Sequence, residues 1–97
     1  MNNNYAQLFK ALSDENRLII LEKLIEGQTC GCTLIDSLSI SQPTMSYHLN
    51  ILAQSGLTST KRDGTWKKHY VNIELIDQLI VYLQNLKNPT HTCHVKE

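Results

Sequence analysis

The strongest constraint on the fold lies in residues 33–56, where two helical patterns follow one another with very little chain between them. Residues 33–36 have the Ser/Thr-x-x-acid spacing of a capping box, which predicts a brief helix ending near Leu38. After a tight turn, Pro43 occupies the first turn of a second helix, which Gly56 ends. Two helices joined by so short a turn predict a helix-turn-helix.

A hairpin pattern follows this helix pair directly. Residues 57–62 and 66–73 are rich in Thr, Val, Tyr and Trp, which favour strands. Between them, Asp63-Gly64 is a strong hairpin-turn dipeptide. We therefore expect a two-stranded β-wing after the helix-turn-helix.

Helical periodicity on both sides completes the domain. Residues 5–12 predict a first short helix, and Ser13 or Asp14 caps a second helix that Gly27 ends. The expected apolar face of this second helix consists of Leu18, Leu21, Leu24 and Ile25. The sequence thus predicts a mainly α winged helix-turn-helix with five helices and a two-stranded wing, in the order ααααββα. One domain would cover residues 1–88, followed by a mobile tail over 89–97.

The last predicted helix, residues 74–86, is unusually apolar. Val81 and Tyr82 fall outside its main stripe, which suggests packing on two sides. A chain of 97 residues buries a small core and gains stability from a partner subunit. We therefore expect a dimer. The stripe is formed by Leu75, Ile76, Leu79, Ile80, Leu83 and Leu86.

Charge is distributed unevenly along the chain, although the formal net charge is zero. Residues 1–36 carry more acidic than basic groups, whereas residues 37–73 carry four basic groups and the single acid Asp63. Positive charge concentrated on one segment is what a DNA contact requires. The four basic residues, all close to the wing tip, are Lys61, Arg62, Lys67 and Lys68. Lysines that protect a hairpin edge from aggregation are the alternative explanation.

The helix of residues 42–55 has a second, polar face, with His48 at its margin. Short polar side chains suit hydrogen bonding to base edges in a major groove, which admits a helix. An ordinary solvated surface is the alternative, but such a surface usually carries Lys and Glu. The candidate DNA-reading residues are Gln42, Thr44, Ser46, Tyr47 and Asn50.

No apolar run approaches the roughly 20 residues that span a bilayer, and residues 1–7 lack the features of a signal peptide. We expect a cytoplasmic protein with no membrane contact. Nothing resembles a nucleophile elbow, a phosphate loop or an HExxH site, so we expect no enzyme.

In a reducing compartment the three cysteines are expected to be free thiols or metal ligands. Cys30 and Cys32 are one residue apart, and paired thiolates select soft ions. Because positions i and i+2 of a helix point about 200° apart, a shared ion requires a turn that is non-helical or that the ion unwinds. Three alternatives to an ion site remain for Cys30 and Cys32. They could form a thiol redox switch, they could serve a thiol metal buffer that does not bind DNA, or they could be two small buried side chains. Cys93, between His91 and His94, is available as a third ligand or belongs to a tail without function.

Several strings together resemble the ArsR/SmtB family of metalloregulatory repressors, over nearly the whole chain. They are Ala11-Leu12-Ser13-Asp14-Glu15-Asn16-Arg17-Leu18, Ser41-Gln42-Pro43-Thr44-Met45-Ser46-Tyr47-His48-Leu49, Leu52, Ser55-Gly56-Leu57, Arg62-Asp63-Gly64 and Tyr70. The resemblance implies a homodimer built on the first and last helices. It also implies an inverted-repeat operator and repression of an ion-resistance operon.

Cys30-Gly31-Cys32 is similar to the element at which arsenic- and cadmium-responsive members bind their inducers. Ile35 stands where some arsenic sensors have a third cysteine, and the family's zinc site is missing because residues 74–87 contain no histidine. The resemblance therefore implies release from the operator by arsenite or antimonite, with cadmium or lead as the second choice. No cofactor is required.

Overall fold

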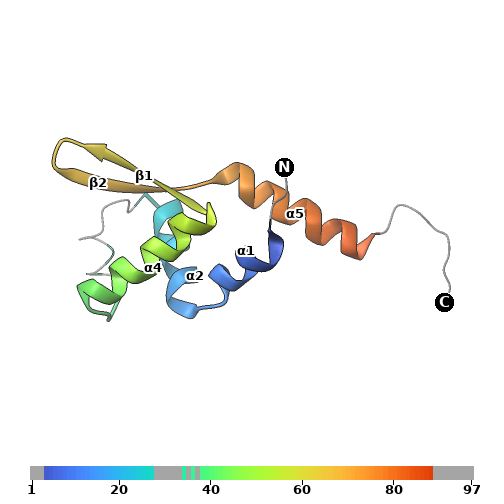
Figure 1. Cartoon of the computed structure of the whole chain (residues 1–97), viewed down its shortest axis with the longest axis horizontal. Coiled ribbons are helices and arrows are strands. Elements are labelled where there is room, and N and C mark those ends of the chain that lie inside the picture. The colour runs from blue at the N-terminus through green and yellow to red at the C-terminus, as the bar shows by residue number, and fades with distance from the viewer. Residues whose placement is uncertain (1–3, 28–33, 35, 37, 89–97) are drawn as a thin grey trace.

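A computed structural model describes residues 4–27, 34, 36 and 38–88 (Figure 1). Within them, four helices and one hairpin are arranged as the sequence predicts for a winged helix-turn-helix. The elements in chain order are α1 (Tyr5–Leu12), α2 (Glu15–Ile25), α4 (Gln42–Ser55), β1 (Thr58–Asp63), β2 (Trp66–Val71) and α5 (Ile73–Lys87). No helix of this described part is long and apolar enough to cross a membrane.

The expected count of five helices is not reached in the described residues. The brief helix predicted from Thr33 to about Leu38 falls largely outside them, as does the tail of residues 89–97. The backbone N–H of Leu38 donates to the carbonyl oxygen of Leu34 at 3.1 Å, and both side chains are buried. Residues 34 and 38 thus join the core of the domain.

The ends of α4 follow local sequence signals. The side chain of Ser41 accepts a hydrogen bond from the backbone N–H of Thr44, and Pro43 lies in the first turn. Gly56 ends the helix at φ 90°, a left-handed conformation in which glycine avoids the strain of a Cβ atom. A cap of this kind stabilises a helix by about 1 kcal/mol, so the bounds of α4 are fixed locally.

A single core joins every helix to the base of the hairpin. Ile20, Leu34, Met45, Leu52 and Leu57 are almost completely buried and come from four different segments. Leu8 and Ala11 of α1 and Leu75 and Leu79 of α5 extend this core. α4 is therefore held by its apolar face, with its other face free.

The buried face of α2 differs from the prediction. Leu21 and Leu24 are buried as expected, but Leu18 and Ile25 are exposed, and Ile20 and Arg17 are buried in their place. The helix is rotated because the Arg17 guanidinium finds hydrogen-bond acceptors inside the domain, which offsets the cost of its burial.

The hairpin pairs Thr58 with Val71 and Asp63 with Trp66, leaving a two-residue loop of Gly64 and Thr65. Gly64 has φ 67°, as a tight hairpin turn requires. β1 contacts α4 and β2 contacts α2, so the base of the wing is anchored on both helices. Its tip extends beyond them (Figure 1).

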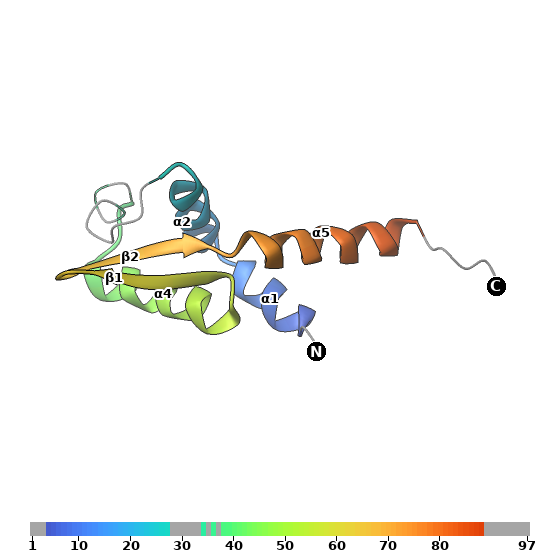
Figure 2. The ribbon, with the colours of Figure 1, turned by 90° about the horizontal axis from the view of Figure 1, so that it is seen from above.

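α5 packs on the domain as far along as Tyr82, and its C-terminal end then projects from it (Figure 2). Tyr82, predicted outside the apolar stripe, stacks on Tyr5 of α1 with ring centroids 4.2 Å apart. A row of large apolar side chains stays exposed on the remaining surface of α5. These are Ile80, Val81, Leu83 and Leu86.

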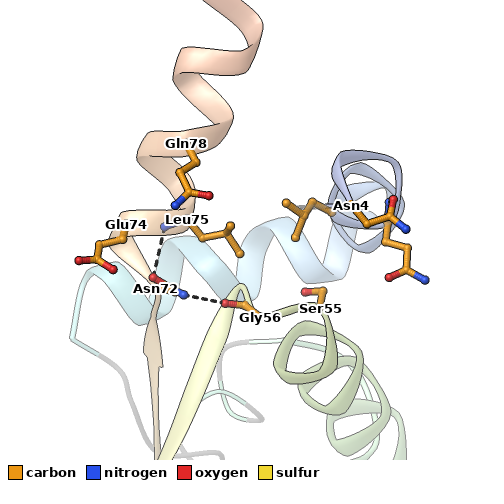
Figure 3. A pocket seen from close by; sticks show the side chains of 9 residues that line it. Asn4, Ser55, Gly56, Asn72, Glu74, Leu75 and Gln78 are labelled. Carbon is orange, nitrogen blue, oxygen red and sulfur yellow. Dashed lines mark hydrogen bonds between the residues drawn. The ribbon is translucent and has the colours of Figure 1, made fainter. Parts of the chain in front are cut away.

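Asn72 ties the wing, α4 and α5 together (Figure 3). Its side-chain amide donates to the carbonyl oxygen of Gly56 at 3.1 Å, and its Oδ1 accepts from the backbone N–H of Leu75 at 3.2 Å. A polar cavity of about 380 Å³ lies beside this junction, between α1 and α5. The junction sets the angle between the wing and the end of α4.

Candidate DNA interface

The predicted reading face of α4 is exposed to solvent. Gln42, Ser46, Tyr47 and Asn50 are exposed, while Met45, Leu49 and Leu52 face the core. Tyr47 is the largest of these exposed side chains and is 59% exposed. The helix therefore presents polar groups on the side that a major groove could receive.

Thr44 lies at the edge of this face and is half-buried. The Ser41 hydroxyl donates to the Thr44 hydroxyl oxygen at 2.9 Å, in addition to capping its backbone N–H. Thr44 thus belongs partly to the N-terminal cap of α4, and its own hydroxyl proton remains available as a donor.

His48 is buried and does not belong to the polar face, contrary to the expectation that it lies at the margin. It is 6% exposed, and its Nδ1 lies 3.1 Å from Nη1 of Arg17. Because a guanidinium only donates hydrogen bonds, Nδ1 is the acceptor, which assigns the ring proton to Nε2. The imidazole thus joins α4 to α2 rather than to DNA.

Arg17 was not predicted as a structural residue. Its Nε donates to the carbonyl oxygen of Ala11 at 2.6 Å and its Nη2 to that of Lys10 at 3.5 Å. With His48, these contacts join α1, α2 and α4 through one side chain that is 9% exposed. The arginine among the apolar positions of α2 was the only available sequence signal.

The cations of the wing lie close to its tip. Lys61, Arg62 and Lys67 are exposed and form no ion pair with a carboxylate in the described part of the chain. Lys68 is half-buried. Three exposed cations outnumber the single acid at the tip, Asp63, and give it a positive potential suited to phosphates.

The wing tip and the N-terminal end of α4 lie at the same end of the molecule in both views, whereas α5 extends from the opposite end (Figures 1 and 2). A duplex that receives the polar face of α4 would therefore pass close to the wing. The two groups predicted from the sequence therefore lie at the same end of the molecule.

His69 on β2 makes the stability of the wing dependent on pH. Burial, and secondarily the charge of Lys67, lower its pKa below the usual 6.5. The folded chain then binds fewer protons than the unfolded chain, so stability is complete above pH 6.5 and falls as the pH drops through the lowered pKa.

We expect His69→Gln to reduce this loss of stability, as measured by urea unfolding at several pH values between neutral and mildly acidic. An unchanged pH dependence in the variant would contradict the assignment. Thr60, whose hydroxyl lies 3.2 Å from Nδ1 of His69, offers a matched control because Thr60→Val removes the hydrogen bond without removing the imidazole.

Cys30, Cys32 and Cys93 all lie outside the described residues. Among the residues that are described, no group of three His, Cys, Asp or Glu side chains could hold a metal ion. The predicted inducer site therefore remains a prediction from the sequence.

A helix-turn-helix with an exposed polar second helix and a cationic β-wing defines the class of winged-helix DNA-binding proteins. Residues 14–60 match the bacterial regulatory proteins of the arsR family. The chain belongs to the arsR family. It is a DNA-binding transcriptional regulator and not an enzyme.

Relatives support this membership over most of the chain. An HTH-type transcriptional regulator from Methanocaldococcus jannaschii is 40% identical, with 84% of this chain and 92% of the relative covered. An arsenical resistance operon repressor from Staphylococcus aureus is 34% identical, with coverage of 92% and 86%. A homodimeric winged helix-turn-helix domain from Mycobacterium bovis superposes with a TM-score of 0.70 at 25% identity, with coverage of 96% and 86%.

Proposed function

We propose that this regulator is a homodimeric repressor that leaves its operator when arsenite or antimonite binds Cys30 and Cys32. The exposed polar face of α4 beside a cationic wing is the observation that carries the DNA-binding part of this proposal. The residues that would contact base edges are Gln42, Thr44, Ser46, Tyr47 and Asn50. Lys61, Arg62, Lys67 and Lys68 would contact phosphates. The protein would act in the cytoplasm.

The exposed apolar row of α5 supports dimerisation. Four large side chains exposed along one helix form a patch that favours association with another protein surface. The relative from Mycobacterium bovis is homodimeric, and α1 and α5 are the elements that the family resemblance indicates. A dimer would present two copies of α4 to major grooves about 34 to 36 Å apart, which favours an inverted repeat.

The choice of inducer rests on the cysteines and on the relatives. Paired thiolates prefer soft ions, and proteins from Staphylococcus aureus and Bacillus subtilis with 34% and 39% identity are arsenical resistance operon repressors. Arsenite and antimonite therefore come first, with cadmium or lead as the alternative. Cys93 is a candidate third ligand.

A pathway from the cysteines to α4 is available through the core. Leu34, two residues after Cys32, is fully buried and belongs to the same cluster as Met45 and Leu49 of α4. An ion that pulls the preceding turn into a new shape would strain this packing, because close-packed cores do not deform continuously. The two copies of α4 would then no longer fit both half-sites.

Gel retardation of the regulator's own promoter fragment by the full-length protein tests the proposal. We expect retardation by the metal-free dimer and its loss on addition of arsenite or antimonite, with weaker effects of cadmium, lead and zinc. Failure to bind any promoter DNA would contradict the DNA-binding proposal. Binding that none of these ions reverses would contradict only the sensing proposal.

The wing cations provide a separate prediction. Lys67→Ala combined with Lys68→Ala should weaken binding to all DNA sequences and reduce the slope of log K against log salt by about 0.9 for each phosphate that the variant no longer neutralises. Binding isotherms at several salt concentrations measure this slope. Lys87→Ala, at the far end of α5, is the control and should leave the slope unchanged. Equal slopes in the double variant and the wild type would exclude backbone contacts by these lysines.

A further inference from the structure

An apolar groove of about 410 Å³ lies where α2, the end of β2 and the start of α5 meet. β2 contacts α2, and Asn72 alone separates β2 from α5 (Figure 2), so three elements border the groove. Small-molecule sites occupy about 300 to 1,000 Å³, and this groove falls within that range. Its apolar lining consists of Leu21, Ile25, Val71, Ile73 and Ile76.

Two of these large apolar side chains are left mostly in water. Ile25 is 62% exposed and Ile73 is 55% exposed. The rotation of α2 that buries Arg17 turns Ile25 away from the core, so the domain itself does not cover this side chain. Because apolar surface is stabilised when it leaves water, the groove favours an apolar occupant.

The charged groups at the groove are acidic. Glu22 and Glu26, one turn apart on α2, line its edge, and no Lys, Arg or His of the described residues joins them there. Glu26 has only a long ion pair with Lys23, at 4.0 Å, and the Glu22 carboxylate has no ion pair within the described part of the chain. Two carboxylates beside an apolar surface attract a cation and repel an anion.

We propose that this groove is a second effector site, apart from the cysteines, and that its ligand is a small lipophilic cation. The apolar body of the ligand covers Ile25 and Ile73, and its positive charge lies beside Glu22 and Glu26. A second copy of the chain is the alternative occupant, because Ile76 continues toward the exposed Ile80 along α5. The pair of carboxylates favours the cation.

The position of the groove connects such a ligand to DNA binding. A molecule held between α2, β2 and α5 fixes the orientation of α5 relative to the rest of the domain. Because α5 carries the proposed dimer surface, this orientation affects the spacing of the two copies of α4. Ligand and operator would then change each other's affinity by the same factor. The effector role rests on the proposed DNA binding, whereas binding of the cation does not.

Tetraphenylphosphonium and tetraphenylborate are matched probes, because the two ions have nearly the same size and shape and opposite charge. Isothermal titration calorimetry measures both on the full-length protein, in the oligomeric state that it has in solution. We expect saturable binding of tetraphenylphosphonium that is at least about tenfold tighter than that of tetraphenylborate. Added salt should reduce this difference, because the carboxylates lie at the surface.

Nuclear magnetic resonance of the isoleucine methyl groups locates the bound cation. We expect the resonances of Ile25, Ile73 and Ile76 to shift during the titration with tetraphenylphosphonium. The resonance of Ile51, on α4 and outside the groove, is the internal control and should stay in place.

Variants separate the charges from the apolar lining. Glu22→Gln combined with Glu26→Gln should weaken tetraphenylphosphonium binding about tenfold, because each exposed charge pair contributes modestly. Glu15→Gln, in the first turn of the same helix, is the matched control and should bind like the wild type. Ile25→Ala should also weaken binding, whereas Leu18→Ala, which removes an exposed apolar side chain of α2 outside the groove, should not.

Equal affinity for the two ions, or an unchanged affinity of the double glutamine variant for tetraphenylphosphonium, would overturn the cation site. Absence of binding, with unshifted methyl resonances in the groove, would show that another part of the protein covers it and would also overturn the site.

Operator binding with and without saturating tetraphenylphosphonium tests the effector role. We expect operator affinity to change about fivefold or more, the lower end of typical coupling between two sites. An unchanged operator affinity would overturn the effector role. A protein that binds tetraphenylphosphonium but no operator DNA would contradict the proposed function and leave the cation site standing.

Discussion

Serine at position 30 or 32 is expected to leave the repressor on its operator at arsenite concentrations that release the wild type. A hydroxyl preserves the size of the side chain but is a poor ligand for a soft ion. If the ion does not bind, it cannot lower the affinity of the domain for DNA. The decrease of about 5- to 150-fold that typical coupling between two sites produces should therefore be absent. Affinity of the ion-free protein should not change.

Fluorescence anisotropy of labelled operator, titrated with arsenite in the absence of added thiols, measures this result for Cys30→Ser and Cys32→Ser separately. Release of either variant at the wild-type arsenite concentration would contradict a site built on both thiolates. Loss of binding before any arsenite is added would indicate a structural role instead.

Cys93→Ser is the matched comparison, because it removes a thiol of the same kind from the C-terminal tail. A response weakened by about an order of magnitude or more identifies Cys93 as the third ligand, since each thiolate adds substantially to the affinity for a soft ion. A wild-type response identifies a site of two protein thiolates, completed by solvent or another group. The same titration distinguishes the two forms of the site.

Arg17→Met is expected to reduce the free energy of unfolding by about 3 kcal/mol, because each buried acceptor that loses its donor costs about 1–3 kcal/mol. The carbonyl oxygen of Ala11 and the Nδ1 of His48 both lose their partner. Urea unfolding followed by circular dichroism measures the change. Lys23→Met, which removes a half-buried cation of the same helix whose ion pair with Glu26 is long at 4.0 Å, is the control and should change stability by less than about 0.5 kcal/mol.

Variants of His48, the partner of Arg17, show whether the junction is stabilised by this hydrogen bond or only by packing. His48→Asn keeps an acceptor near the position of Nδ1, whereas His48→Leu leaves the Arg17 guanidinium without one. We therefore expect the leucine variant to be the less stable of the two. Equal stabilities, or a stable Arg17→Met protein, would show that the junction of α1, α2 and α4 does not depend on this hydrogen bond.

The elements with strong local signals could be predicted from the sequence. Ser41, Pro43 and Gly56 define α4 because capping and glycine termination act within one turn of the helix. Asp63-Gly64 identified the hairpin in the same way, although Asp63 pairs with Trp66 and the loop residues are Gly64 and Thr65. The polar face of α4 follows once its core positions are known.

The remaining features depend on contacts far apart in the chain. Arg17 and His48 are 31 residues apart, so nothing in the neighbourhood of either residue signals that both are buried. For the same reason the rotation of α2, which exposes Leu18 and Ile25, could not be predicted from its periodicity. The stripe on α5 was predicted correctly as apolar, but a single chain buries only part of it.

The central claim is that α4 reads the operator sequence, and competition binding tests it most directly. Affinities of the wild type, Gln42→Ala and Ser46→Ala are measured at one salt concentration for the operator and for a scrambled duplex of the same length. We expect each variant to lose at least about tenfold on the operator, because a good base contact is worth about 1–3 kcal/mol of discrimination, and to bind the scrambled duplex like the wild type. Equal losses on both duplexes would contradict the claim.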